Sequence, residues 1–231
     1  MENEISIPKL ILIDKPKGIT SFDVIRILRK QLDIKKMGHA GTLDPLATGL
    51  LLVGVGSGTK KLHNLVGLPK TYYVEILLGR KTTTGDMEGD IVEEKEVGEL
   101  KEEILRSVLQ KLIGTLKLPV PVYSAVKRGG VPLYKKARQG EKVIAPVREM
   151  KVFDVRLIQH EKDEKGYIVA VEMDVASGVY VRSVAEEFGR ILDVPATVKE
   201  LRRTKIGDFD VKDAKQLEYD KKVIKKRIFN N

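Results

Sequence analysis

The chain has 231 residues, a length that suits one large domain or two small ones. It contains no cysteine and three scattered histidines, so disulfides and thiolate metal sites are excluded and a histidine-built zinc site is not expected. No stretch approaches the roughly 20 apolar residues of a membrane span, and the N-terminus does not resemble a signal peptide, so we expect a cytoplasmic protein. The net charge of +9 favours a polyanionic partner, above all nucleic acid.

The first part of the chain predicts two apolar strands around a helix. Leu10–Ile13 is an apolar run that predicts a buried strand. Thr20 or Ser21 then caps a helix whose apolar side chains recur at helical spacing, namely Val24, Ile25, Leu28 and Leu32. Leu50–Val55 is a second apolar run, and the alternation over Tyr72–Leu78 predicts a strand.

The rest of the chain mixes both element types. Thr82–Gly89 is rich in turn formers, and Leu100–Ile113 has helical periodicity and ends at Gly114. Further on, the patterns predict strands and then helices: strands at Lys151–His160 and Ile168–Val175, helices at Val181–Leu192 and Ala196–Leu201. Regular βαβ alternation is missing, so we expect an α+β fold with a mixed, mainly antiparallel sheet flanked by helices.

Basic residues gather in four clusters: Arg26–Lys36, Lys127–Arg148, Arg202–Lys205 and Lys221–Arg227. Each could be a phosphate-binding surface or simply a solvated face or tail. The segment from residue 119 to residue 148 stands apart because it is rich in proline, glycine and lysine and carries Tyr123 and Tyr134. A basic loop with aromatic rings suits RNA, since charge attracts phosphate and rings stack on bases. The alternative is a plain surface excursion between two strands.

Asp44 is the one acid of the run Gly38–Gly49, which also holds a proline, a histidine and further glycines. A loop shaped by glycine and proline can hold a catalytic carboxylate at a fixed place. From spacing alone, Asp44 could instead cap a following helix that Pro45 begins. Gly54–Lys60 is glycine-rich, but it lacks the Walker and dinucleotide-binding spacings, so a nucleotide site is not expected there.

Several motifs, in order along the chain, resemble those of the TruB family of pseudouridine synthases, which modify the T-loop of tRNA. They are LIDKPKG at residues 12–18, GHAGTLDPLATGLL at 38–51, KTYY at 70–73, PVPVYSAVK at 119–127, SGVYVRS at 177–183 and LRRT at 201–204. The resemblance covers about Leu10 to Gly207. It implies the pseudouridine synthase fold over residues 1–231, with a thumb-like insertion at about 119–148 that grips RNA.

The resemblance implies three catalytic residues. Asp44 is the essential carboxylate, which must be ionised, and Arg182 is the cation that offsets its burial. If Val179–Arg182 is an alternating strand, Tyr180 and Arg182 lie on one face of it. Tyr72 stacks on the extruded uracil or relays a proton. Tyr73 is the competing residue, and in a strand it should face the opposite way.

Other residues are expected to hold the RNA. By resemblance, His39 fills the space left by the flipped nucleotide, Lys15 supports the loops of the site, and Leu201 walls the uracil pocket. Contacts with RNA are expected from Tyr180 and, in the insertion, from Tyr123, Lys127 and Arg138. Arg202 and Arg203 are expected to serve packing or phosphate contacts.

We expect a monomer that acts on the T-arm of tRNA without metal or organic cofactor, because the isomerisation is redox-neutral. A non-catalytic RNA-binding protein and a guide-RNA-dependent synthase remain alternatives. Bacterial members usually carry a further C-terminal RNA-binding domain. Here only Asp213–Lys226 remains, as a closing helix and basic tail, so we expect that domain to be absent and the grip on the acceptor stem to be weaker.

Overall fold

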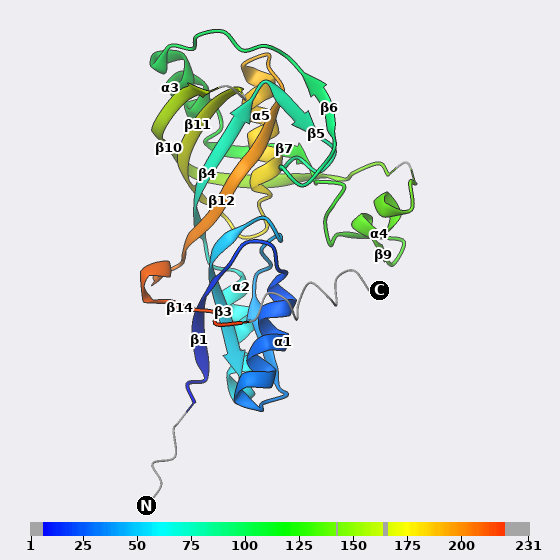
Figure 1. Ribbon diagram of the computed structural model, residues 1–231, viewed down its shortest axis with the longest axis vertical. Coiled ribbons are helices and arrows are strands. Elements are labelled where there is room, and N and C mark those ends of the chain that lie inside the picture. Colours follow the sequence, from blue (N-terminus) through cyan, green and yellow to red (C-terminus); the bar gives the residue numbers. More distant parts are fainter. Residues whose placement is uncertain (1–6, 142, 164–165, 220–231) are drawn as a thin grey trace, which may run out of the picture. The chain divides into compact units, whose positions relative to one another are not determined.

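The protein is described here by a computed structural model, which covers residues 7–141, 143–163 and 166–219 (Figure 1). The chain divides into two compact units. The first comprises residues 1–66 and 208–231, and the second comprises residues 67–207. Within the described residues, no helix is both long and apolar enough to cross a membrane.

The first unit is a small sheet with one long helix against it. Its sheet has the order β14-β1-β3-β2, in which β1 and β14 are parallel and the other pairs antiparallel. Its elements are β1 (Leu10–Lys15), α1 (Ser21–Leu32), β2 (Met37–Ala40), β3 (Thr48–Val55), a 3₁₀ helix (Gly56–Lys61), α2 (Leu62–Val66), β13 (Phe209–Asp210), a second 3₁₀ helix (Val211–Asp213) and β14 (Lys215–Gln216).

Helix α1 begins where the sequence predicts. Thr20 is its N-cap: the side chain of Thr20 accepts from the Asp23 N–H at 3.1 Å, and the Asp23 carboxylate accepts from the Thr20 N–H at 3.0 Å. This reciprocal capping box satisfies backbone donors at the helix start. The apolar face of α1, with Val24, Ile25 and Leu28, packs into a core with β1, β2 and β3.

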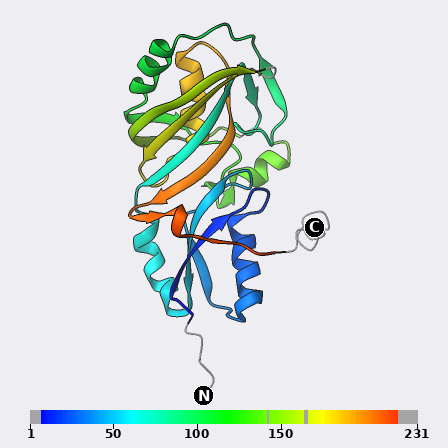
Figure 2. The ribbon, with the colours of Figure 1, turned by 60° about the vertical axis from the view of Figure 1, so that its left-hand side comes forward.

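The second unit is a strongly curved antiparallel sheet of order β12-β4-β11-β10-β7, whose long strands run side by side in Figure 2. Helix α3 packs against β10, and α5 packs against β12 and β7. The elements are β4 (Lys70–Leu78), β5 (Arg80–Thr82), β6 (Ile91–Glu94), α3 (Glu102–Lys111), β7 (Gly114–Pro119), β8 (Lys127–Arg128), β9 (Val131–Pro132), α4 (Leu133–Arg138), β10 (Val147–Asp163), β11 (Gly166–Val175), α5 (Val181–Ile191) and β12 (Ala196–Ile206).

The α+β class with a mixed, mainly antiparallel sheet is confirmed, and so are most of the predicted elements. The helix expected over Ala196–Leu201 is wrong, because these residues open strand β12. Ala196, Thr197 and Val198 are all buried, so both faces of this part of the strand are covered. A strand buried on both faces loses its alternation, and a short apolar run then cannot be told from a helix.

Two further predictions are wrong. Val179–Arg182 is not a strand: a turn at Ser177–Gly178 comes first, and α5 already begins at Val181. The apolar spacing that places Val181, Val184 and Phe188 in the core therefore prevails over the short alternation before it. The closing helix expected over Asp213–Lys226 is not formed by its described part, which holds the end of a 3₁₀ helix and β14. Residues 220–231, with the basic cluster Lys221–Arg227, lie outside the described residues.

Candidate active site

Asp44 lies in the loop between β2 and β3 and is partly exposed. Both of its neighbours are hydrogen-bonded. The Leu43 N–H donates to Ser21 Oγ at 2.8 Å, and the carbonyl of Pro45 accepts from the Gly18 N–H at 2.8 Å. No helix follows Asp44, since β3 starts at Thr48, so the alternative role of Asp44 as a helix cap is wrong. The backbone thus holds this carboxylate in place and leaves it partly open to solvent.

Lys15, at the end of β1, is fully buried beneath this loop. Its ammonium donates to the carbonyl of Ile19 at 2.7 Å, of Pro16 at 2.9 Å and of Pro45 at 3.3 Å. A buried ammonium is stable only where such acceptors surround it. Lys15 therefore ties the segment that leads into α1 to the residue that follows Asp44.

His39 lies in β2, opposite Val53 of β3, and is partly buried.

The glycine-rich segment Gly54–Lys60 has a packing role. A Cβ on Gly58 would lie 1.9 Å from the carbonyl oxygen of Lys9, a distance that real atoms do not reach. Gly58 is therefore glycine because two backbones meet there, which agrees with the expectation that Gly54–Lys60 is not a nucleotide site.

Tyr72 and Tyr73 face opposite sides of β4, as the sequence predicts. Tyr72 is buried and opposes Met173 and Arg203 in the register of the sheet. Leu201 opposes Val74, two residues from Tyr72, so Tyr72 and Leu201 share one face of adjacent strands.

The other face of β4 carries Tyr73. Its hydroxyl donates to Glu75 Oε1 at 3.1 Å. Partial burial, together with the Glu75 carboxylate, raises the pKa of Tyr73. The Glu75 carboxylate and the burial therefore disfavour ionisation of the Tyr73 hydroxyl.

Arg182 is in the first turn of α5 and is buried. Its Nη1 donates to the carbonyl of Thr84 at 2.7 Å and lies 3.6 Å from Asp86 Oδ2. Its Nη2 donates to the carbonyl of Tyr123 at 3.1 Å. Oxygen acceptors from separate segments fix the direction of this guanidinium. Tyr180, the residue before α5, is partly buried.

The segment from residue 119 to residue 148 leaves the sheet between β7 and β10 and carries β8, β9 and α4 (Figure 1). Val120, Ser124 and Leu133 are buried in it, whereas Lys127 and Arg138 are exposed. The Arg138 guanidinium lies 5.8 Å from the centre of the Tyr134 ring, a cation–π arrangement. The surface thus offers exposed cations beside an aromatic ring.

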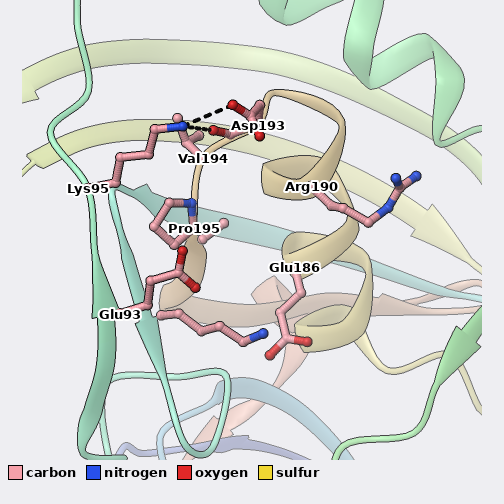
Figure 3. A pocket seen from close by; sticks show the side chains of 9 residues that line it. Glu93, Lys95, Glu186, Arg190, Asp193, Val194 and Pro195 are labelled. Carbon is pink, nitrogen blue, oxygen red and sulfur yellow. Dashed lines mark hydrogen bonds and ion pairs between the residues drawn. The ribbon is translucent and has the colours of Figure 1, made fainter.

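A separate hollow of the second unit is lined by charges of both signs (Figure 3). Lys95 Nζ donates to the Asp193 carbonyl at 2.5 Å and to its carboxylate at 3.0 Å. Glu186 faces Lys81 there, and burial raises the pKa of its carboxyl.

In the described part of the chain, no three His, Asp or Glu side chains are grouped so as to hold a metal ion.

Sequence reasoning missed Asp86 and Lys70. Asp86 lies in the turn-rich segment, where its Oδ1 accepts from Thr84 Oγ1 at 2.6 Å and from the Glu88 N–H at 3.1 Å. The only signal for it was an acid among turn formers, in a segment that also holds Glu88. Lys70 donates to Ser177 Oγ at 2.9 Å, and burial, with Arg203 nearby, lowers its pKa to about 8. Lys70 belongs to the KTYY motif at residues 70–73, but nothing in the sequence marks it as buried.

The chain matches known proteins along most of its length. The model of the "TruB family pseudouridylate synthase (N terminal domain)" matches residues 29–181. The tRNA pseudouridine synthase B of Endomicrobium trichonymphae is 39% identical over 226 residues, which cover 96% of each chain. That of Thermosipho melanesiensis is 42% identical over 200 residues, 87% of this chain and 64% of the relative.

Among solved structures, a chain from a Cbf5-Nop10-Gar1 complex superposes with a TM-score of 0.69 and 28% identity, over 90% of this chain and 52% of that one. A chain from an H/ACA RNP bound to a substrate RNA containing 2′-deoxyuridine gives 0.66 and 25%, over 90% and 50%. Both the fold and the sequence therefore agree with the family match, and the chain belongs to the TruB family of pseudouridylate synthases.

Proposed function

We propose that this protein isomerises uridine to pseudouridine in tRNA, at position 55 of the T-loop. The family match and the relatives named tRNA pseudouridine synthase B support the activity. The observation that carries the proposal is the loop of Asp44, whose neighbours on both sides are hydrogen-bonded while the acid itself stays partly exposed. Such preorganisation suits a group that must meet one reacting atom.

Asp44 acts as the essential carboxylate, as a nucleophile or as a base, while the glycosidic bond is cleaved and the sugar is rejoined to C5 of the same base. Tyr72 stacks on the extruded uracil, and Leu201, on the same sheet face, forms an apolar wall. Arg182 supplies a fixed positive charge for the reaction.

The target base must leave its stack, which costs a few kcal/mol. His39 fills the space that the base leaves, and Lys15 holds the loop of Asp44. Tyr180 and, in the insertion, Tyr123, Lys127 and Arg138 contact the RNA; the exposure of Lys127 and Arg138 supports this role. We assign the whole chain to one catalytic domain with this insertion, working as a monomer on the T-arm in the cytoplasm.

Tritium release from T-arm RNA labelled at C5 of uridine tests the function. The wild type should release tritium, and Asp44→Asn should abolish release while leaving RNA affinity and folding intact. Asp208→Asn is the matched control, since Asp208 is an exposed acid in a turn, and it should react at the wild-type rate. Equal release from the wild type and Asp44→Asn would refute the role of Asp44.

A second candidate is a synthase that depends on partner proteins or a guide RNA. The superposition on chains from a Cbf5-Nop10-Gar1 complex and an H/ACA RNP favours it. The same assay separates the two, because a stand-alone enzyme needs only the protein and the RNA. Tight, salt-sensitive T-arm binding without any release would favour this second candidate or a non-catalytic RNA-binding protein.

A further inference from the structure

The first turn of α5 is bonded to the start of the insertion at two points. Ser183 Oγ donates to the carbonyl of Pro119 at 2.7 Å, and Arg182 Nη2 donates to the carbonyl of Tyr123 at 3.1 Å. Ser183 and Arg182 are both buried. Bonds between buried polar groups are costly to lose, because no water replaces the missing partner.

The chain between these two carbonyls is stiff. It contains Pro121, whose ring fixes the backbone angle φ and restricts the preceding Val120, and Val120 is buried. The Val120 N–H donates to the carbonyl of Pro146 at 2.9 Å, which closes the neck of the insertion. A displacement of Tyr123 is therefore passed along this short segment rather than absorbed by it.

The start of helix α4, farther along the insertion, is hydrogen-bonded to the residues that follow Tyr123. The Tyr134 N–H, in α4, donates to the carbonyl of Ser124 at 3.2 Å, and the Leu133 N–H donates to the carbonyl of Val126 at 2.8 Å. Helix α4 also carries the exposed Arg138. A continuous series of backbone bonds therefore leads from the basic surface of the insertion to Tyr123, and from Tyr123 to the guanidinium of Arg182.

We propose that Ser183 is a positioning residue, which fixes the root of the insertion so that the Tyr123 carbonyl holds Arg182 in its working direction. RNA held by the insertion then also stabilises the placement of Arg182. This inference rests on the proposed function. It predicts that loosening the root lowers the rate of the bound complex more than it weakens RNA binding.

The test is Ser183→Ala, with Ser183→Thr as the variant that keeps the hydroxyl and Ser107→Ala as the control, an exposed serine of α3. The chain has no cysteine, so Ala125→Cys gives a single exposed site for a fluorophore in the insertion. We expect Ser183→Ala to lower label anisotropy without RNA and to slow single-turnover pseudouridine formation roughly tenfold at saturating tRNA transcript. The dissociation constant should change less than threefold, and Ser183→Thr should restore rate and anisotropy.

Two results would overturn the proposal: an unchanged anisotropy in Ser183→Ala, or a slower rate that Ser183→Thr does not restore. A loss of unfolding stability alone, with wild-type rate and anisotropy, would show that Ser183 only packs α5 against β7. The anisotropy measurement needs no catalysis, so it tests the tether even if the wild type forms no pseudouridine. A wild type that forms no pseudouridine, together with a lower anisotropy in Ser183→Ala, would contradict the proposed function but support the link between Ser183 and the insertion.

Discussion

Replacing Lys15 by methionine should both destabilise the protein and disable it. The substitution keeps the length of the side chain but removes the ammonium donor from three carbonyls, at contacts of 2.7, 2.9 and 3.3 Å; the Pro45 carbonyl keeps its bond from the Gly18 N–H. Hydrogen bonds to charged groups contribute about 1.5–3 kcal/mol each, and removing the buried charge recovers part of the loss. We therefore expect a net loss of about 3 kcal/mol in the free energy of unfolding.

Urea unfolding followed by far-UV circular dichroism measures this loss, since the chain has no tryptophan. With a slope of about 3 kcal/mol per molar, the midpoint should fall by about 1 M. Loss of the Lys15 bond to Pro45 should also shift Asp44, and a misplacement near 1 Å can cost about 100-fold in rate. Lys9→Met, at an exposed lysine before β1, is the control. A Lys15→Met protein with the wild-type midpoint and wild-type rate would refute the anchoring role of Lys15.

Three further outcomes are expected. Gly58→Ala should cost about 1–3 kcal/mol in unfolding free energy because its Cβ meets a backbone carbonyl, whereas Gly98→Ala, in open space, should cost little; equal midpoints in urea would contradict this. Asp86→Asn should lower stability by about 2–4 kcal/mol, because it removes a buried carboxylate 3.6 Å from the buried guanidinium of Arg182, and an unchanged melting temperature would argue against that. The pKa of Lys70 is about 8 in the folded protein and 10.5 in the unfolded chain. Between these two pH values the unfolded state binds one more proton than the folded state. The free energy of unfolding should therefore rise with pH over this range, by up to about 3 kcal/mol. In urea unfolding measured at a series of pH values, Lys70→Met should flatten this rise, whereas Lys205→Met, at an exposed lysine, should keep it. The same pH dependence of the unfolding free energy in both variants would mean that other groups cause it.

Local sequence determined the elements that carry their own signals. The capping residues and the apolar spacing of α1 are neighbours in the sequence, so the helix start could be narrowed to Thr20 or Ser21, and the structure assigns the cap to Thr20. The alternation in β4 likewise set Tyr72 and Tyr73 on opposite faces, because successive strand side chains point in opposite directions. The motifs around Asp44 and Tyr72 pointed to the same family that the whole-chain comparisons give.

Only the tertiary structure decided features that depend on distant partners. Ala196–Leu201 became a strand because β4 supplies its backbone hydrogen bonds, which no local pattern reveals. The prediction that Asp44 caps a helix was wrong because Ser21 and Gly18, more than 20 residues away in the sequence, hydrogen-bond to its two neighbours. The burial of Lys15, Asp86 and Lys70 follows from the same cause. A charged side chain is exposed by default, and only the folded chain can bring enough acceptors or opposite charge around it to keep it inside.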